Sequence, residues 1–255
     1  MLPIRRLLCA GTLFVIAALV GCAGLPVSAS DDQRQSLAPT GRLRVGVTSI
    51  SPTKGVTTDL GKALAERLGV EFVLVDVKSQ AELLAGVAAG KIDFSGTNAS
   101  PARAAQMDFT TTVLDIELGY LVVAGSTVSK FSDVDRTGVR IGVTQGSTSL
   151  TTLPKLLKNA TVVPMPPLKT ASQMFLAKEI DVYATNKSIL MNMSRDIPNS
   201  RILDGKWGVE HWAICIPKGR EIGLAYLQKF IESARGKEVV TAAADKAGLS
   251  GSVVP

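Results

Sequence analysis

The feature that most constrains the fold is an alternation of short apolar segments with amphipathic segments, which begins at Leu43 and continues through residue 233. Short apolar runs rich in Val and Ile are typical of buried strands, whereas apolar residues spaced three and four apart are typical of helices. Two successive series of strands and helices predict a chain folded as two α/β lobes. Strands are predicted at 43–47, 71–77, 92–96, 118–124, 139–144, 161–164, 180–184 and 212–216, and helices at 58–68, 79–89, 147–157, 170–177, 187–193 and 221–233.

The same alternation indicates where a binding site should lie. In open α/β sheets, ligands bind in the loops beyond the carboxyl ends of the strands. The loops that follow Val47, Phe94, Val143 and Tyr183 are therefore the expected places for functional side chains. The alternation by itself fits a binding protein and an enzyme equally well.

The N-terminal residues have the pattern of a secretory signal. Arg5 and Arg6 precede an apolar run at 7–20, which is shorter than the roughly 20 residues that a membrane-spanning helix needs. We therefore predict a signal peptide at 1–22 and a location in the periplasm, or on a membrane surface facing the periplasm or the exterior. Residues 23–40 contain Ser, Asp, Gln and Pro without periodicity, and this composition predicts a flexible tether.

Two cleavage sites are open. The sequence Leu-Val-Gly-Cys at 19–22 resembles a bacterial lipobox, in which Cys22 is acylated and becomes the first residue of the mature chain. The sequence Val-Ser-Ala at 27–29 has the small residues that an ordinary signal peptidase cuts. The lipobox is preferred because Cys22 comes directly after the apolar run, and a lipid there would attach the protein to a membrane.

Charge and residue types exclude several classes of function. The net charge of +6 falls to +4 without Arg5 and Arg6, and the remaining basic residues are scattered. Seven Phe, two Trp and three Tyr form no aromatic and basic platform, so no nucleic-acid partner is expected. A single histidine, His211, and no zinc spacing predict no metal site, and no cofactor is expected. Cys215 is the one cysteine beyond the predicted signal peptide at 1–22, so it is expected to pack as a small apolar residue.

Five sequence blocks, in order, resemble one protein family. They are GRLRVGV at 41–47, DLGKALAERLGV at 59–70, SPARA at 100–104 with DFT at 108–110, GVRIGV at 138–143 with QGST at 145–148, and KEIDV at 178–182. With these blocks the chain is similar, over about residues 41–248, to the family 3 bacterial extracellular solute-binding proteins, the receptors of polar amino-acid ABC importers.

The resemblance implies a fold and a function. It implies a periplasmic-binding-protein-like α/β fold of type II, in which two lobes are joined by two crossing strands with a ligand cleft between them. Lobe one would be 41–124 plus 209–255, and lobe two 125–208. The expected protein is a monomer that captures a small carboxylate-bearing solute, an amino acid or related organic acid, and delivers it to the permease of an ABC transporter.

The resemblance also implies a set of ligand-binding residues. The planar guanidinium of Arg103 suits bidentate capture of a carboxylate, and the family's arginine at this position holds the ligand α-carboxylate. Asn98 and Ser100 fall where the family surrounds that same carboxylate. Ser147 and Thr148 open a helix, whose free N–H groups and dipole favour an anion. A surface arginine, ordinary turn formers and a plain helix cap are the alternatives for these positions.

One departure from the family pattern concerns the ligand amine. The family places an Asp near the start of the helix after the second-lobe Ile-Asp strand, where it binds the ligand ammonium, and here that residue is Asn186. Either the ligand lacks a free α-amino group, or another acid in the cleft takes over. The first interpretation is preferred, because no other acid lies close by in the helix that Asn186 opens. The short loop at 48–52 and the segment at 109–113 also lack the family's usual aromatic residues.

Two other functions are kept as alternatives. A periplasmic enzyme of the same fold, such as a dehydratase, needs an acid or base in the cleft, and the candidates are Asp115, Glu117 and Glu210, none in a distinctive context. A sensory or partner-binding module is the third interpretation. Asp59 is expected to cap a helix, and packing or rim positions are expected for three further residues, namely Trp207, His211 and Trp212.

Overall fold

The computed structural model describes residues 29–49, 51–165, 173 and 177–249. The predicted signal peptide with Cys22, and most of the helix predicted at 170–177, fall outside these ranges. In the described part of the chain, no helix combines the length and the hydropathy needed to span a bilayer.

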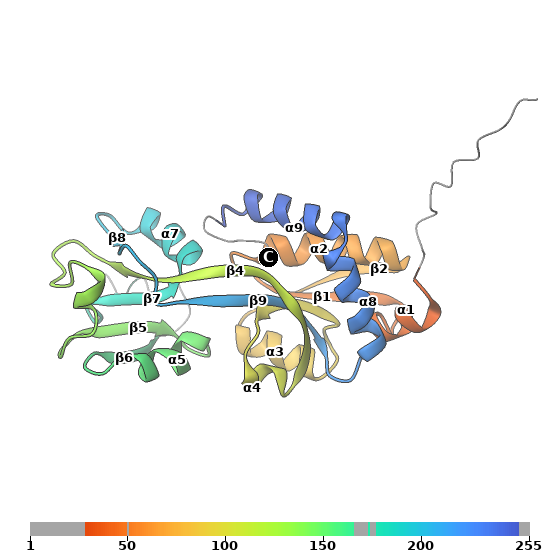
Figure 1. Cartoon of the computed structure of the whole chain (residues 1–255), viewed down its shortest axis with the longest axis horizontal. Coiled ribbons are helices and arrows are strands. Elements are labelled where there is room, and N and C mark those ends of the chain that lie inside the picture. The colour runs from red at the N-terminus through yellow and green to blue at the C-terminus, as the bar shows by residue number, and fades with distance from the viewer. Residues whose placement is uncertain (1–28, 50, 166–172, 174–176, 250–255) are drawn as a thin grey trace, which may run out of the picture.

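A mixed sheet runs through the molecule in the order β2–β1–β3–β9–β4–β7–β5–β6, and β8 is added beside β4. Strands β1, β2 and β3 pair in parallel, as do β6, β5 and β7. Strands β4 and β9 are antiparallel to each other and lie between these two groups, so they join two lobes (Figure 1). The strands are β1 (Arg42–Thr48), β2 (Glu71–Val77), β3 (Phe94–Asn98), β4 (Met107–Val122), β5 (Arg140–Thr144), β6 (Thr161–Met165), β7 (Val182–Asn186), β8 (Arg201–Ile202) and β9 (Gly208–Pro217).

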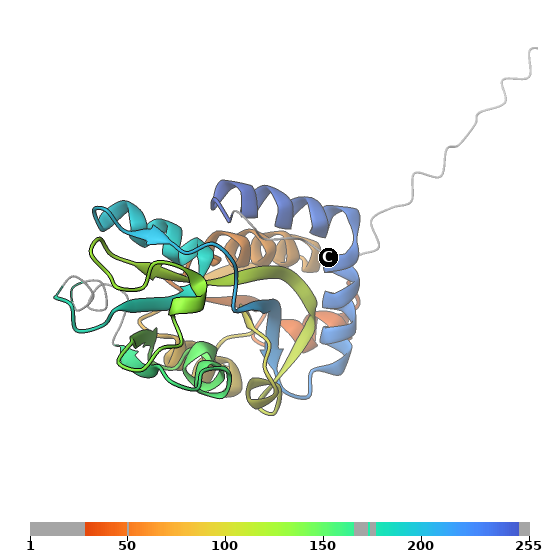
Figure 2. The same cartoon turned by 60° about the vertical axis from the view of Figure 1, so that its left-hand side comes forward.

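Helices cover the sheet in both lobes. In lobe one, α2 and α9 lie along one side of the strands and α3 lies on the other (Figures 1 and 2). Helix α2 buries Val56, Leu60, Leu64 and Leu68, a stripe with one residue per turn. The helices are α1 (Asp31–Leu37), α2 (Lys54–Leu68), α3 (Gln80–Ala88), α4 (Pro101–Ala104), the 3₁₀ helix η1 (Phe131–Asp133), α5 (Thr148–Leu156), α7 (Lys187–Asp196), α8 (Glu221–Glu232) and α9 (Ala234–Lys246).

Each lobe has its own hydrophobic core. In lobe one, Leu43, Phe94 and Phe230 belong to a cluster that also includes residues of α2, β9 and α9. In lobe two, Ile141 and Val182 belong to a separate cluster built from β4, β5, β7 and α5. The predicted fold class, two α/β lobes joined by crossing strands, is therefore confirmed.

Both lobes contain the same arginine–aspartate pair between their first and third strands. In lobe one, Arg44 Nε and Nη2 donate to the two oxygens of Asp93 at 2.7 and 2.8 Å, and the Arg44 backbone N–H also donates to Asp93. In lobe two, Arg140 makes the same three hydrogen bonds to Asp181, at 2.8–3.0 Å. The lobe-one pair is the more buried, because Asp93 is 0 % exposed and has Arg220 as a second partner at 2.9 Å.

The crossing strands set the register where the lobes meet. Along β4 and β9, Ile116 lies opposite Glu210 and Leu118 opposite Gly208. On its other side, β4 begins to pair with β7 at the same Leu118, which lies opposite Asn186. The register therefore brings Glu210 of β9 and Asn186 of β7 to the same short stretch of β4.

The prediction of a tether at 23–40 is wrong for its second half, because residues 31–37 form α1. The Ser30 hydroxyl accepts a hydrogen bond from the Gln33 N–H, and the Gln33 side chain accepts one from the Ser30 N–H, which caps the helix at its start. Leu37 is fully buried, and the Gly223 N–H of α8 donates to Ser36 Oγ at 3.0 Å. A helix of two turns is too short for its apolar spacing to be recognised in the sequence.

Three smaller differences have similar causes. Helix α2 begins at Lys54, four residues before the predicted start, so Asp59 lies inside the helix and the predicted capping role is wrong. The segment 97–112, for which neither a strand nor a helix was predicted, contains the end of β3, α4 and the first residues of β4. Helix α9 was not predicted, because Ser233 ends α8 and at the same time caps α9 by accepting the Gly236 N–H.

Candidate functional site between the lobes

Arg103 is held at the carboxyl end of β3 by the loop that follows this strand. It lies in α4, a single turn that begins at Pro101, a residue whose fixed φ suits the first position of a helix. Its Nη1 donates to Thr97 Oγ1 and to the Asn98 carbonyl oxygen, both at 2.9 Å. Burial lowers the pKa of Arg103, and the negative charge of Glu210 opposes that shift. The Nε and Nη2 groups make no hydrogen bond to the described residues.

A hydrogen bond connects the two lobes beside this arginine. Asn98 Nδ2, at the end of β3, donates to Thr148 Oγ1, in the first residue of α5, at 3.0 Å. The Thr148 hydroxyl in turn donates to Glu210 Oε1 at 3.3 Å. The polar contacts therefore run from lobe one to lobe two and then to a crossing strand.

Glu210 is the centre of these contacts. Its Oε1 accepts from Thr148, and its Oε2 accepts from Asn186 Nδ2 at 3.4 Å. Burial raises the pKa of the Glu210 carboxyl, while the Asn186 amide, the Arg103 charge and the Thr148 hydroxyl act in the opposite direction. We call Asn98, Arg103, Thr148, Asn186 and Glu210 the interlobe cluster.

Asn186 serves as the N-cap of α7. Its Oδ1 accepts the Ile189 N–H at 3.0 Å, which satisfies one of the unpaired N–H groups at the helix start. The amide oxygen therefore faces the helix, and the amide nitrogen faces Glu210. This orientation follows from the Ile189 N–H, because that group requires an acceptor.

The two predicted serines differ in their surroundings. Ser147 is the N-cap residue of α5, next to Thr148, and its hydroxyl oxygen is buried without a partner among the described residues. Ser100 is the N-cap residue of α4, and its side chain makes no capping hydrogen bond. The structure thus brings together Asn98, Arg103, Thr148 and Asn186, places Ser147 beside them, and does not connect Ser100 to them by a hydrogen bond.

Glu210 is the residue that sequence reasoning failed to rank. It was one of three candidate acids without a distinctive context, because its partners Thr148 and Asn186 are 62 and 24 residues away along the chain. The available signal was an acidic residue just before the apolar run at 212–216. The preference for a ligand without an amine rested on the absence of a nearby acid, and the contact between Glu210 and Asn186 removes that reason.

The other two candidate acids contact basic side chains. His211 Nδ1 lies 2.8 Å from Asp115 Oδ1, and both side chains are exposed. Glu117 receives Lys187 Nζ at 2.7 Å and Lys206 Nζ at 3.1 Å, and these contacts lower the pKa of its carboxyl. Glu117 is therefore engaged in two ion pairs, and Asp115 contacts a histidine ring.

The tryptophans and the cysteine contribute to packing. Trp207 lies against Tyr120, with ring centroids 6.2 Å apart, and its Nε1 donates to the Gly119 carbonyl oxygen at 3.0 Å. Trp212 is buried against Gly96, where an added Cβ would lie 1.9 Å from the indole ring. Burial raises the pKa of the Cys215 thiol to about 12, so it stays neutral in the lobe-one interior. The packing predicted for Trp207, Trp212 and Cys215 is confirmed.

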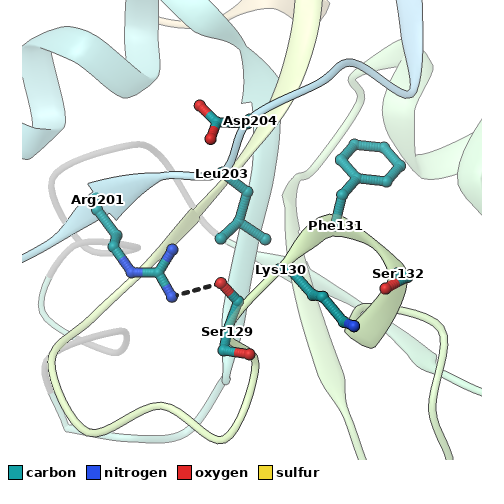
Figure 3. A pocket seen from close by; sticks show the side chains of 7 residues that line it. All are labelled: Ser129, Lys130, Phe131, Ser132, Arg201, Leu203 and Asp204. Carbon is teal, nitrogen blue, oxygen red and sulfur yellow. Dashed lines mark hydrogen bonds between the residues drawn. The ribbon is translucent and has the colours of Figure 1, made fainter.

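A cavity of about 450 Å³ lies in lobe two, away from the interlobe cluster (Figure 3). Arg201 faces the 129–132 segment across it, and its Nη2 donates to the Ser129 carbonyl oxygen at 2.7 Å. No predicted site residue lines it, and two further cavities lie between elements of lobe one. Within the described ranges, no group of three or more His, Cys, Asp or Glu side chains could hold a metal ion.

Comparisons with known proteins identify the family and the fold of this chain. The family model for bacterial extracellular solute-binding proteins, family 3, matches residues 48–248. No curated protein matches the chain.

Solved structures with the same fold include three informative ones. A putative ABC-transporter binding component from Wolinella succinogenes, complexed with lysine, has a TM-score of 0.71 at 20 % identity over 81 % of this chain and 95 % of that chain. An amino-acid ABC transporter substrate-binding protein from Streptococcus pneumoniae, bound to L-arginine, scores 0.67 at 21 % identity over 84 % and 98 %. An ancestral amino-acid-binding protein, described as a precursor of cyclohexadienyl dehydratase, scores 0.68 at 20 % over 83 % and 97 %.

Proposed function

Because the chain belongs to family 3 of the bacterial extracellular solute-binding proteins, we propose that it captures a small carboxylate-bearing solute, an amino acid or related organic acid, and delivers it to an ABC importer. The solute would bind in a cleft between lobes with boundaries at 41–124 plus 209–255 and 125–208. The protein would act as a monomer in the periplasm or on a membrane surface that faces it.

The interlobe cluster is the observation that carries this proposal. Residues of both lobes and of a crossing strand meet in one chain of hydrogen bonds, so a solute bound there would contact both lobes at once. Domain closure around a ligand needs contacts of this kind.

Arg103 is the proposed carboxylate anchor. Its Nη1 is held by two acceptors in the last two residues of β3, which fixes the plane of the guanidinium. The remaining nitrogens of Arg103 are Nε and Nη2. In Arg44 the same two nitrogens donate to the two carboxylate oxygens of Asp93. A carboxylate of the solute could be held by the same two-pronged arrangement.

Calorimetry with a panel of amino acids and organic acids tests this assignment. Replacing Arg103 with Ala should cost at least about 1.5–3 kcal/mol of binding free energy, or about 10- to 150-fold in Kd. Arg103→Lys should also bind poorly, because an ammonium cannot reproduce the fork. Arg42→Ala, which removes an exposed arginine at the far end of β1, is the matched control and should bind normally. Wild-type affinity in Arg103→Ala would refute the assignment.

A dehydratase-like enzyme is the second candidate function, and Glu210 is the observation that favours it. A carboxyl whose pKa is raised by burial holds its proton closer to neutral pH, as a general acid must. The two functions differ in what happens to the solute. Mass spectrometry of the solute recovered after prolonged incubation should find it unchanged for a receptor and chemically altered for an enzyme.

We also propose that Cys22 is acylated and becomes the first residue of the mature chain. The apolar run ends directly before it, and family members act outside the cytoplasm. Mass spectrometry of the mature N-terminus decides the matter: an acylated Cys22 is expected, and an unmodified terminus at Ser30 would contradict the proposal.

A further inference from the structure

We propose that Glu210 binds the ammonium group of the solute and so selects amino acids that carry a free amine over acids that lack one. This inference rests on the proposed function, because it assigns a second contact within the same site. The group that binds the solute amine would then lie on the crossing strand β9, and not at the start of α7, where Asn186 is located.

The first step concerns what Asn186 cannot do. One lone pair of its oxygen accepts the Ile189 N–H of α7 at 3.0 Å, and the neutral amide brings no negative charge to a solute ammonium. Its nitrogen carries the amide hydrogens, and a hydrogen-bond donor offers nothing to an ammonium, which is also only a donor. The amide instead donates to Glu210 Oε2, so its effect on a solute amine passes through the carboxylate that it orients.

The second step concerns the charge of Glu210. Among the described residues, no Lys, Arg or His nitrogen lies within 4.0 Å of this carboxylate, whereas Glu117 has two lysine partners at 2.7 and 3.1 Å and Asp115 has a histidine nitrogen at 2.8 Å. Its two hydrogen bonds, at 3.3 and 3.4 Å, come from neutral groups and leave lone pairs on both oxygens. A partly buried carboxylate of this kind is stabilised when a cation is placed against it.

The third step balances the charges of the whole site. Arg103 supplies one positive charge, and its Nε and Nη2 are available to donate hydrogen bonds. Glu210 supplies one negative charge close enough to affect the pKa of that arginine. A zwitterion matches both: its carboxylate faces Arg103 and its ammonium faces Glu210. A simple organic acid would pair with Arg103 and leave Glu210 as an unpaired like charge beside it, which disfavours binding.

Matched pairs of solutes and a relocated carboxylate test the inference. The probes are L-arginine with 5-guanidinopentanoic acid, L-glutamine with 4-carbamoylbutanoic acid, and L-cysteine with 3-mercaptopropionic acid, each pair differing only in the α-amino group. Calorimetry gives the ratio of the two Kd values for each pair. For whichever pair binds, the wild-type protein should have a Kd for the amine-bearing member that is lower by about 10-fold or more.

Glu210→Gln should bring this ratio close to one by weakening the amino acid and sparing the desamino acid. The retained binding of the desamino acid shows that the variant is folded. Adding Asn186→Asp to Glu210→Gln should restore the preference, since Asp caps a helix as well as Asn does and returns a carboxylate to within reach of the amine. Glu117→Gln, which removes an acid paired with Lys187 and Lys206, is the control and should keep the wild-type ratio.

Two results would overturn the inference. One is an unchanged preference for the amine in Glu210→Gln, and the other is equal binding of both members of a pair by the wild-type protein. Either result leaves the proposed function standing as long as Arg103→Ala weakens binding of both members. Binding that is insensitive to Arg103 is instead evidence against the proposed function itself.

Discussion

The repeated arginine–aspartate pair allows a comparison of one interaction in two environments within a single chain. Asp93 and Asp181 accept the same three hydrogen bonds from the arginine of their lobe's first strand, so Asp93→Ala and Asp181→Ala remove equivalent contacts. The environments differ. The Asp93 side chain is fully buried between Arg44 and Arg220, whereas the side chains of Asp181 and Arg140 are 30 % and 43 % exposed.

The expected costs follow from this difference. Asp93→Ala leaves two largely buried guanidinium groups without their anion, and breaking such a buried pair costs about 3–5 kcal/mol. In Asp181→Ala, water replaces the lost partner of Arg140, and an exposed pair contributes only about 0.2–1 kcal/mol. For a chain of this length, about 2–4 °C of melting temperature corresponds to each kcal/mol. The expected decreases are therefore about 6–20 °C for Asp93→Ala and about 4 °C or less for Asp181→Ala.

Thermal unfolding followed by circular dichroism measures both shifts. Glu71→Ala serves as a reference, because the Arg42–Glu71 contact is 3.5 Å long and both side chains are about two-thirds exposed, so almost no change is expected. Equal decreases for Asp93→Ala and Asp181→Ala would refute the reasoning. In that case the shared hydrogen bonds, and not burial, would determine the contribution of each pair.

Two further predictions concern stability. Leu37→Ala should destabilise the protein by about 2–5 kcal/mol, because Leu37 is fully buried where α1 packs on α8; an unchanged melting temperature would show that α1 is not part of the lobe-one core. The hydrogen bonds from Arg140 hold the pKa of Asp181 below its ordinary value, so its stabilising effect is complete above the pKa of the unfolded chain and is lost as pH falls through the folded pKa. The difference in melting temperature between wild type and Asp181→Ala should therefore shrink between about pH 4 and pH 2, and a constant difference over that range would contradict this linkage.

The parts of the fold predicted from sequence are those fixed by local patterns. The predicted bounds of the strands at 43–47, 71–77 and 139–144 agree with the observed bounds within two residues. A buried strand is a short run of apolar residues, and such a run can be recognised from neighbouring positions alone. Helices α1 and α9 were missed, since α1 is short and α9 follows α8 through a single shared residue, Ser233. Their stability comes from packing on other elements, and local spacing does not record that packing.

The candidate site shows the same division. Arg103 and Thr148 could be proposed because each lies in a short block that resembles the family pattern, and Asn98 because it lies two residues before one of these blocks, at the end of a strand. Glu210 could not be ranked, because its importance depends on the register of β4 between β7 and β9. A register of this kind results from long-range strand pairing, and no window of sequence around Glu210 contains it.

The packing of α1 on lobe one also limits how far the protein could reach from a membrane. Ala29 is already buried in lobe one, so an acylated Cys22 would be separated from the folded body by only residues 23–28. Even fully extended, seven residue steps span about 25 Å, whereas a free tether to residue 41 would span about 65 Å. Lobe one would then stay next to the lipid headgroups, and the receptor would meet its importer by lateral diffusion in the plane of the bilayer. Confinement to that thin layer raises the effective concentration of the two partners without any additional contact between them.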